Sequence, residues 1–165
     1  MTKGRRQANS PLDHAARAKA SAHGWLWSPG RRTDYLLATT RALASTRSQV
    51  LGMELLHNNL HEVFSQRDPE RRWAAIERTY TEDVTFIDPE GAFVGRQALS
   101  DQAQKLLDGV LAGFVLEEDG PRYIGTDIAA LAWRFGPPGH PVARGIDILT
   151  IRDGRVSAVR TLIAP

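Results

Sequence analysis

The chain changes character near Ser48, where hydrophobic residues begin to recur at a regular spacing. From there they fall three and four residues apart, which is the period of an amphipathic α-helix. The pattern predicts a first helix that begins near Ser48 and buries one face. The apolar residues of that face are Val50, Met53, Leu56, Leu60, Val63 and Phe64.

Asp68 and Pro69 predict the start of a second helix. An aspartate side chain can cap free backbone N–H groups, and proline fits the first helical position. We expect this helix to run to about Tyr80. Its core side is predicted to hold Trp73, Ala75, Ile76 and Thr79, and its solvated side Arg71, Arg72, Glu77 and Arg78.

The remaining chain alternates between β-rich runs and turns, with one further helix. The runs 84–88 and 92–95 flank a Pro/Gly turn and predict a hairpin, and a third helix is expected from Arg96 to about Val110. Asp153-Gly154 suits a type I′ turn, which needs two residues with positive φ. Further strands are predicted at 114–117, 123–125, 128–135, 142–152 and 155–163.

This order of elements predicts an α+β fold in which three helices pack on the concave side of a curved, mainly antiparallel sheet. Within 142–152, Ile146 and Ile148 point to one face, whereas Leu149 and Ile151 point to the other. An antiparallel strand with two apolar faces must be covered on both. One face would line an interior, and we expect the outer face of the sheet to form a homodimer.

Composition narrows the class of protein. Of the 165 residues, 42% are hydrophobic and 24% charged, which is ordinary for a globular chain. No apolar run approaches eighteen residues and no secretory signal is evident, so we expect no membrane span and a cytoplasmic location. The absence of cysteine excludes disulfides, thiolate nucleophiles and cysteine metal sites.

Positive charge is concentrated at the N-terminus. Residues 1–50 hold nine Lys and Arg against two Asp, a net of +7, so the rest carries −5 to give the total of +2. We expect residues 1–48 to form a basic, disordered arm without a fixed partner and residues 49–165 to form the folded domain. Contact of the arm with nucleic acid is the alternative, and an initiator at Met53 would remove the arm.

The run Tyr80 to Gly91, YTEDVTFIDPEG, followed by FVGRQAL at 93–99, resembles the central segment of nuclear transport factor 2-like proteins. Within that group the chain is most similar to the SnoaL-like and ketosteroid-isomerase-like members, over about residues 50–163. The resemblance implies a cone-shaped, cystatin-like roll, often dimeric, that is open at one end. For function it implies a range, from isomerases, cyclases and hydrolases to non-catalytic modules.

Two aspartates carry the finer resemblance to ketosteroid isomerase. Asp88 stands where that family places its general base, and Gly145-Ile146-Asp147 resembles the strand with its protonated oxyanion-hole aspartate. The family's catalytic tyrosine, expected from the first helix, is absent. That segment reads His57, Asn58, Asn59, Leu60 and His61.

The residues themselves leave two interpretations open for each aspartate. Strand alternation puts Asp88 on the face of Val84 and Phe86, in apolar space where it could carry a proton, but it could equally cap the turn at Pro89. Asp147 lies mid-strand among apolar residues, where an unpaired charge is costly. It would either donate a hydrogen bond to a ligand or pair with Arg134 or Arg160 on an adjacent strand.

A ligand pocket would need further side chains. His57 and His61 share a helix face but lack a third ligand, so we expect neither a metal nor a cofactor, and His61 could replace the missing tyrosine as a hydrogen-bond donor. The aromatic side chains would line the interior or simply fill the core. They are Phe86, Phe93, Phe114, Trp133 and Phe135.

Taken together, the residues predict a small enzyme of the isomerase or cyclase type that performs acid/base chemistry on an apolar carbonyl compound. Asp88 would be the general base and Asp147 the protonated acid. The alternative is a non-catalytic module of the same fold that binds a ligand or dimerises.

Overall fold

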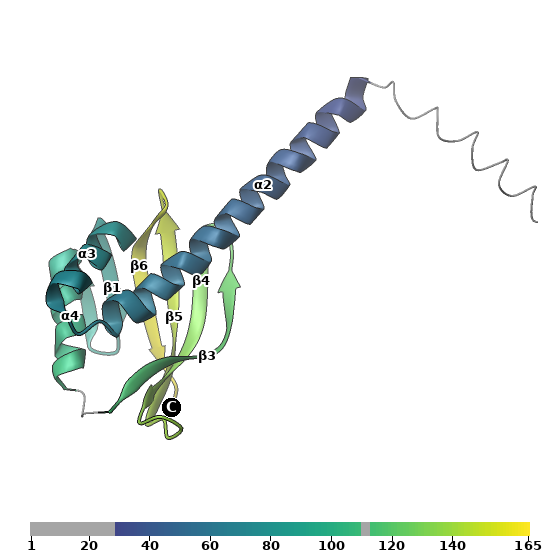
Figure 1. Ribbon diagram of the computed structural model, residues 1–165. Coiled ribbons are helices and arrows are strands. Elements are labelled where there is room, and N and C mark those ends of the chain that lie inside the picture. Colours follow the sequence, from purple (N-terminus) through teal and green to yellow (C-terminus); the bar gives the residue numbers. More distant parts are fainter. Residues whose placement is uncertain (1–28, 110–112) are drawn as a thin grey trace, which may run out of the picture. The chain divides into compact units, whose positions relative to one another are not determined.

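The computed structural model describes the backbone of residues 29–109 and 113–165. It describes the side chains of these residues from residue 42 onward. The chain divides into two units, 1–42 and 43–165, and the second carries the sheet. The elements, labelled in Figure 1, are α2 (Pro29–His57), the π-helix η1 (Asn58–Phe64), α3 (Pro69–Thr79), β1 (Tyr80–Asp88), β2 (Gly91–Val94), α4 (Arg96–Asp108), β3 (Val115–Ile124), β4 (Ile128–Gly136), β5 (Ala143–Arg152) and β6 (Arg155–Ile163).

Six strands form one mixed sheet in the order β2-β1-β6-β5-β4-β3. All neighbouring strands are antiparallel except β1 and β6, which run parallel and join the early hairpin to the C-terminal strands. The helical segment α2–η1, α3 and α4 supply the three predicted helices (Figure 1). The predicted α+β fold with a curved, mixed sheet is confirmed.

Two strand boundaries differ from the sequence prediction. The predicted strands 114–117 and 123–125 are one strand, β3, whose register with β4 shifts between Glu118 and Arg122. Gly120 lies within this shift at φ 144°, so the Gly120-Pro121 pair produces a bulge in a continuous strand and not a turn between two strands. β1 also begins earlier than predicted, at Tyr80.

The first helix is longer than its apolar pattern predicted. α2 begins at Pro29, well before Ser48, and so takes in residues that the sequence assigned to the arm. A proline at the start of a helix is compatible with this, because its missing N–H would have no intrahelical partner there. The rest of the predicted arm, residues 1–28, lies outside the described residues.

The start of α3 confirms the predicted cap, but one side chain of this helix was placed on the wrong face. The Asp68 carboxylate accepts hydrogen bonds from the backbone N–H groups of Glu70 and Arg71, at 3.0 and 3.1 Å. Arg72, predicted to be solvated, is buried because its guanidinium donates to the carbonyl of Gln66 at 2.7 Å and to the side chain of Gln104. It therefore ties α3 to α4, which a single-helix pattern cannot reveal.

The core lies between the helices and the inner face of the sheet. Alternate residues of each strand point inward, and the helices close over them. Of the apolar face predicted for the first helix, Leu56, Leu60, Val63 and Phe64 are buried, whereas Val50 and Met53 are exposed, which corrects that prediction. No helix in the described part of the chain is long and apolar enough to cross a membrane. The largest fully buried apolar side chains are Tyr80, Leu56, Leu60, Ile76, Leu99, Leu131 and Leu149.

Replacing Asp68 with alanine should lower the free energy of unfolding by about 1 kcal/mol, because two backbone donors at the start of α3 lose their acceptor. Urea unfolding followed by circular dichroism measures this change. The exposed α2 residue Glu54 provides the control, since Glu54→Ala should alter stability by less than about 0.5 kcal/mol. Equal effects of the two variants would contradict the capping role.

Candidate functional site

A cavity of about 420 Å³ lies on the inner face of the sheet, beside the second half of α4 and the β1–β2 turn. Its floor is buried, with Phe86, Trp133 and Asp147, whereas Leu106 and Ile163 at its rim are exposed. A buried floor and an exposed rim make it a pocket that a small molecule can enter, and its volume is in the usual range for ligand sites. The lining residues of its polar side are Asp88, Glu90, Gln102, Lys105, Asp147 and Thr161.

Asp147 is the buried carboxylate of this cavity, and three neutral donors hold it. Its Oδ1 accepts hydrogen bonds from Trp133 Nε1 at 3.0 Å and Thr161 Oγ1 at 2.8 Å. Its Oδ2 accepts one from Asn59 Nδ2 at 2.8 Å. Strand register brings Thr161 directly opposite Asp147 on β6, while Asn59 reaches it from the π-helix.

The predicted arginine partners are elsewhere. Arg134 donates to Glu117 at 3.0 Å, and Arg160 is exposed and paired in register with Ile148, on the opposite face from Asp147. Asp147 is thus buried among neutral groups. Burial raises the pKa of the Asp147 carboxyl, and the hydrogen bonds from Thr161, Trp133 and Asn59 oppose that rise only in part.

Two residues behind Asp147 escaped the sequence analysis. Asn59 is completely buried, and its Oδ1 accepts a hydrogen bond from the Tyr80 hydroxyl at 2.7 Å. Burial and the nearby charge of Asp147 raise the pKa of Tyr80. The sequence held one sign of this pair, the absence of the tyrosine expected in the first helix. Asn59 lies in that segment, and a tyrosine from β1 forms a hydrogen bond with it.

Asp88 lines the cavity and also caps the β1–β2 turn, so its two sequence interpretations are compatible. Its Oδ1 accepts hydrogen bonds from the backbone N–H groups of Glu90 and Gly91, at 2.8 and 3.2 Å. In the described part of the chain, Oδ2 has no hydrogen-bond donor. The side chain is half-buried and leaves one carboxylate oxygen available to the cavity.

The predicted aromatic residues divide into two groups. Phe86, Trp133 and Phe135 line the cavity together with Phe64, whose ring centroid lies 5.3 Å from that of Phe86. Phe93 and Phe114 are not among the lining residues. They pack against lining residues, Phe93 against Phe86 at 6.2 Å and Phe114 against Phe135 at 5.4 Å between ring centroids.

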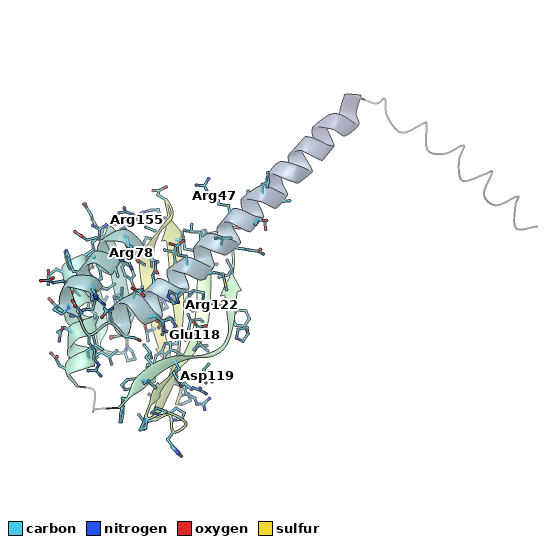
Figure 2. The ribbon with its side chains drawn as sticks, in the orientation of Figure 1. Arg47, Arg78, Glu118, Asp119, Arg122 and Arg155 are labelled. Atoms are coloured by element: carbon cyan, nitrogen blue, oxygen red, sulfur yellow. The ribbon has the colours of Figure 1, made fainter. Side chains whose placement is uncertain are left out.

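His61 is also absent from the cavity wall. Its Nε2 lies 3.3 Å from a carboxylate oxygen of Glu118, which forms a second ion pair with Arg122 (Figure 2). The ring centroids of His57 and His61 lie 4.8 Å apart. Across 42–109 and 113–165, no group of three or more His, Asp or Glu side chains is arranged to hold a metal ion.

Comparison with known proteins relates this chain to one protein family. The family model described as the SnoaL-like domain matches residues 59–159. No curated protein matches the chain significantly. The match covers both aspartates, most of the π-helix and most of the residues that line the cavity, and it bears out the resemblance seen in the sequence.

Solved structures share the fold at low sequence identity. A candidate isomerase of the SnoaL-like family from Agrobacterium tumefaciens has a TM-score of 0.64 at 19% identity, covering 70% of this chain and 99% of its own. A candidate SnoaL-like polyketide cyclase from Jannaschia sp. CCS1 has 0.57 at 16%, covering 69% and 85%. A candidate ketosteroid isomerase from Kribbella flavida has 0.55 at 18%, covering 70% and 78%.

Gly145 allows Trp133 to reach Asp147, and alanine there should break that contact. An added Cβ would overlap the Trp133 ring and lie 2.5 Å from the carbonyl oxygen of Leu162. We expect Gly145→Ala to lower the free energy of unfolding by about 1–3 kcal/mol and to shift the NMR signal of the Trp133 indole N–H. Gly109→Ala is the control, because its φ is −76° and its nearest neighbour is 3.4 Å away. An unchanged indole signal in Gly145→Ala would show that Trp133 tolerates the methyl group.

Proposed function

Because this chain belongs to the SnoaL-like domain family, we propose that its cavity is an acid/base site for a small, apolar carbonyl compound, of the isomerase or cyclase type. One observation carries the proposal: two carboxylates, Asp88 and Asp147, line a single apolar cavity of about 420 Å³. Their surroundings differ. Asp88 is half-buried on a turn, whereas Asp147 is buried among neutral donors. Such a difference separates the roles of base and acid.

In this mechanism Asp88 removes a proton from the carbon next to the ligand's carbonyl group. The electrons of that C–H bond form the C=C bond of an enolate, and the carbonyl oxygen gains negative charge. Asp147 in its neutral form donates a hydrogen bond to that oxygen. Because Oδ1 of Asp147 already accepts two hydrogen bonds, the proton belongs on Oδ2. Burial, which raises the pKa of Asp147, supports this neutral form.

The enolate then has two outcomes. If Asp88 returns the proton to a different carbon, the product is an isomer. If the enolate carbon attacks a second carbonyl group of the same molecule, a ring closes. Four aromatic side chains, Phe64, Phe86, Trp133 and Phe135, would pack against the flat body of such a compound.

Asp88→Asn should slow proton removal about 100-fold or more while the fold stays intact. The amide oxygen of asparagine can still accept from the N–H groups of Glu90 and Gly91, so the turn keeps its cap and only the base is lost. The measurement is deuterium exchange at the α-carbon of uncharged cyclic ketones in D₂O, followed by NMR. Asp101→Asn, an exposed change on α4 outside the cavity, is the control. Full activity of Asp88→Asn would remove Asp88 as the base.

The second candidate is a non-catalytic ligand-binding module. It is favoured by the hydrogen bonds that already hold Asp88 to its own turn. In that case the ketones would bind, as ligand-induced chemical shift changes would report, but the protein would not accelerate their exchange. The open cavity supports either form of ligand handling over a purely structural role.

We further propose that a second copy of the chain covers the outer face of the sheet. Ile146 and Leu162 are neighbours in register there, and both side chains are exposed. Ile128 and Tyr123 add exposed apolar surface on the strands beside them. Large apolar side chains on one continuous sheet face are typical of an interface.

Ile146→Glu should therefore convert a dimer to a monomer, because it places a charge beside Leu162 on the face that the second copy would cover. Light scattering after gel filtration measures the mass of each species. Val142→Glu, a change at a more exposed position just before β5, should leave the dimer intact. A wild-type protein that is monomeric at high concentration would contradict the proposed interface.

A further inference from the structure

The π-helix places three consecutive residues in the interior: Asn58, Asn59 and Leu60. An α-helix advances 100° per residue, so consecutive residues normally diverge from one face. The wider turn of a π-helix changes this register, and such turns are often found at functional sites. Here it directs the polar side chain of Asn59 at Asp147, although Asn59 itself does not line the cavity.

The Tyr80 hydroxyl fixes which end of the Asn59 amide faces Asp147. It donates to Asn59 Oδ1 at 2.7 Å, so Nδ2 is the end that donates to Asp147 Oδ2. Tyr80 is completely buried, and within the described residues its hydroxyl has no other hydrogen-bond partner. If the amide turned over, the phenol hydrogen would be buried without an acceptor, which is unfavourable.

We propose that Asn59 and Tyr80 are positioning residues that set the charge state of Asp147 and keep its proton available to the ligand. Asn59 is the one donor at Oδ2 among the described residues, so it stabilises the ionised carboxylate. With its orientation fixed, Asn59 presents no acceptor to the neutral acid. A turned amide would present its oxygen, and Asp147 would then donate its proton to Asn59 and not to the cavity.

The other groups around Asp147 do not duplicate this role. Trp133 on β4 and Thr161 on β6 both donate to Oδ1. The charged groups that share the cavity are Asp88 and Glu90 from the β1–β2 turn and Lys105 from α4. Lys105 and Glu90 pair with each other at 2.5 Å near the rim, and both are exposed. Asn59 is therefore the group whose removal acts on Oδ2 directly.

The test is an NMR titration of the Asp147 carboxyl carbon, whose signal is identified by its loss in Asp147→Asn. We expect Asn59→Leu to raise the titration midpoint by about one pH unit or more, since the ionised form loses a donor while the branched shape of the side chain is kept. Tyr80→Phe should raise it by less, because the freed amide can offer its oxygen to the protonated acid. Tyr123→Phe, an exposed tyrosine on β3, should leave it unchanged.

A midpoint that stays constant or falls in Asn59→Leu would overturn the proposal. If that variant does not fold, as amide NMR spectra would reveal, Tyr80→Phe decides alone: a raised midpoint supports the positioning role, and an unchanged one overturns it. A general loss of packing would not produce a graded shift at Asp147 with the spectra of distant residues unaltered.

The ligand part of this inference rests on Asp147 being the acid of the proposed function, but the titration requires no turnover. If the midpoints move as expected and no ketone exchanges its α-protons, the positioning role stands and the proposed reaction fails. If exchange depends on Asp88 but the midpoints do not move, the reaction stands and the positioning role fails. Where both hold, the pH profile of exchange should shift upward in Asn59→Leu.

Discussion

A buried carboxylate without a positive partner is the constraint on which the centre of this structure depends. Ionised Asp147 would be costly in apolar surroundings, and no arginine or lysine among the described residues neutralises it. Three neutral side chains donate to it from three elements: η1, β4 and β6. Each of these hydrogen bonds ties one element to Asp147. The one from Asn59 therefore also aligns the π-helix with the sheet. Because such an arrangement lowers the cost of the charge without removing it, the proton affinity of Asp147 stays raised.

The apolar part of the site follows from the same arrangement. Gly145 removes a side chain beside Trp133, so the indole can lie flat against β5 and turn its N–H toward Asp147. The ring then forms part of the cavity floor with Phe86, while Phe93 and Phe114 pack against the lining residues Phe86 and Phe135. One aromatic side chain therefore serves both the hydrogen-bonding network and the surface that a ligand would contact.

Membership of the SnoaL-like domain family and a shared fold do not by themselves specify a reaction, because this architecture supports several kinds of activity. The residues of the site decide which reaction the fold performs. Here the first-helix tyrosine expected from ketosteroid isomerase is absent, and Asn59 occupies that segment with Tyr80 behind it. One of the three donors to Asp147 is thus an amide, and its orientation depends on a second residue.

Local patterns in the sequence predicted most of the elements and placed Asp88 on the strand face of Val84 and Phe86, since helical spacing and strand alternation depend only on neighbouring residues. They left open whether Asp147 faces a ligand or pairs with an arginine. The cap at Asp68 was predictable for the same reason. Tertiary structure alone decided that Arg72 is buried, that Gly120 bends one strand, and that Asn59 meets Asp147 across 88 positions of sequence. That last contact joins a π-helical turn to β5, and a π-helical turn leaves no periodic signal in the chain. Sequence could therefore identify the buried acid, but only the folded chain could supply the groups that hold it.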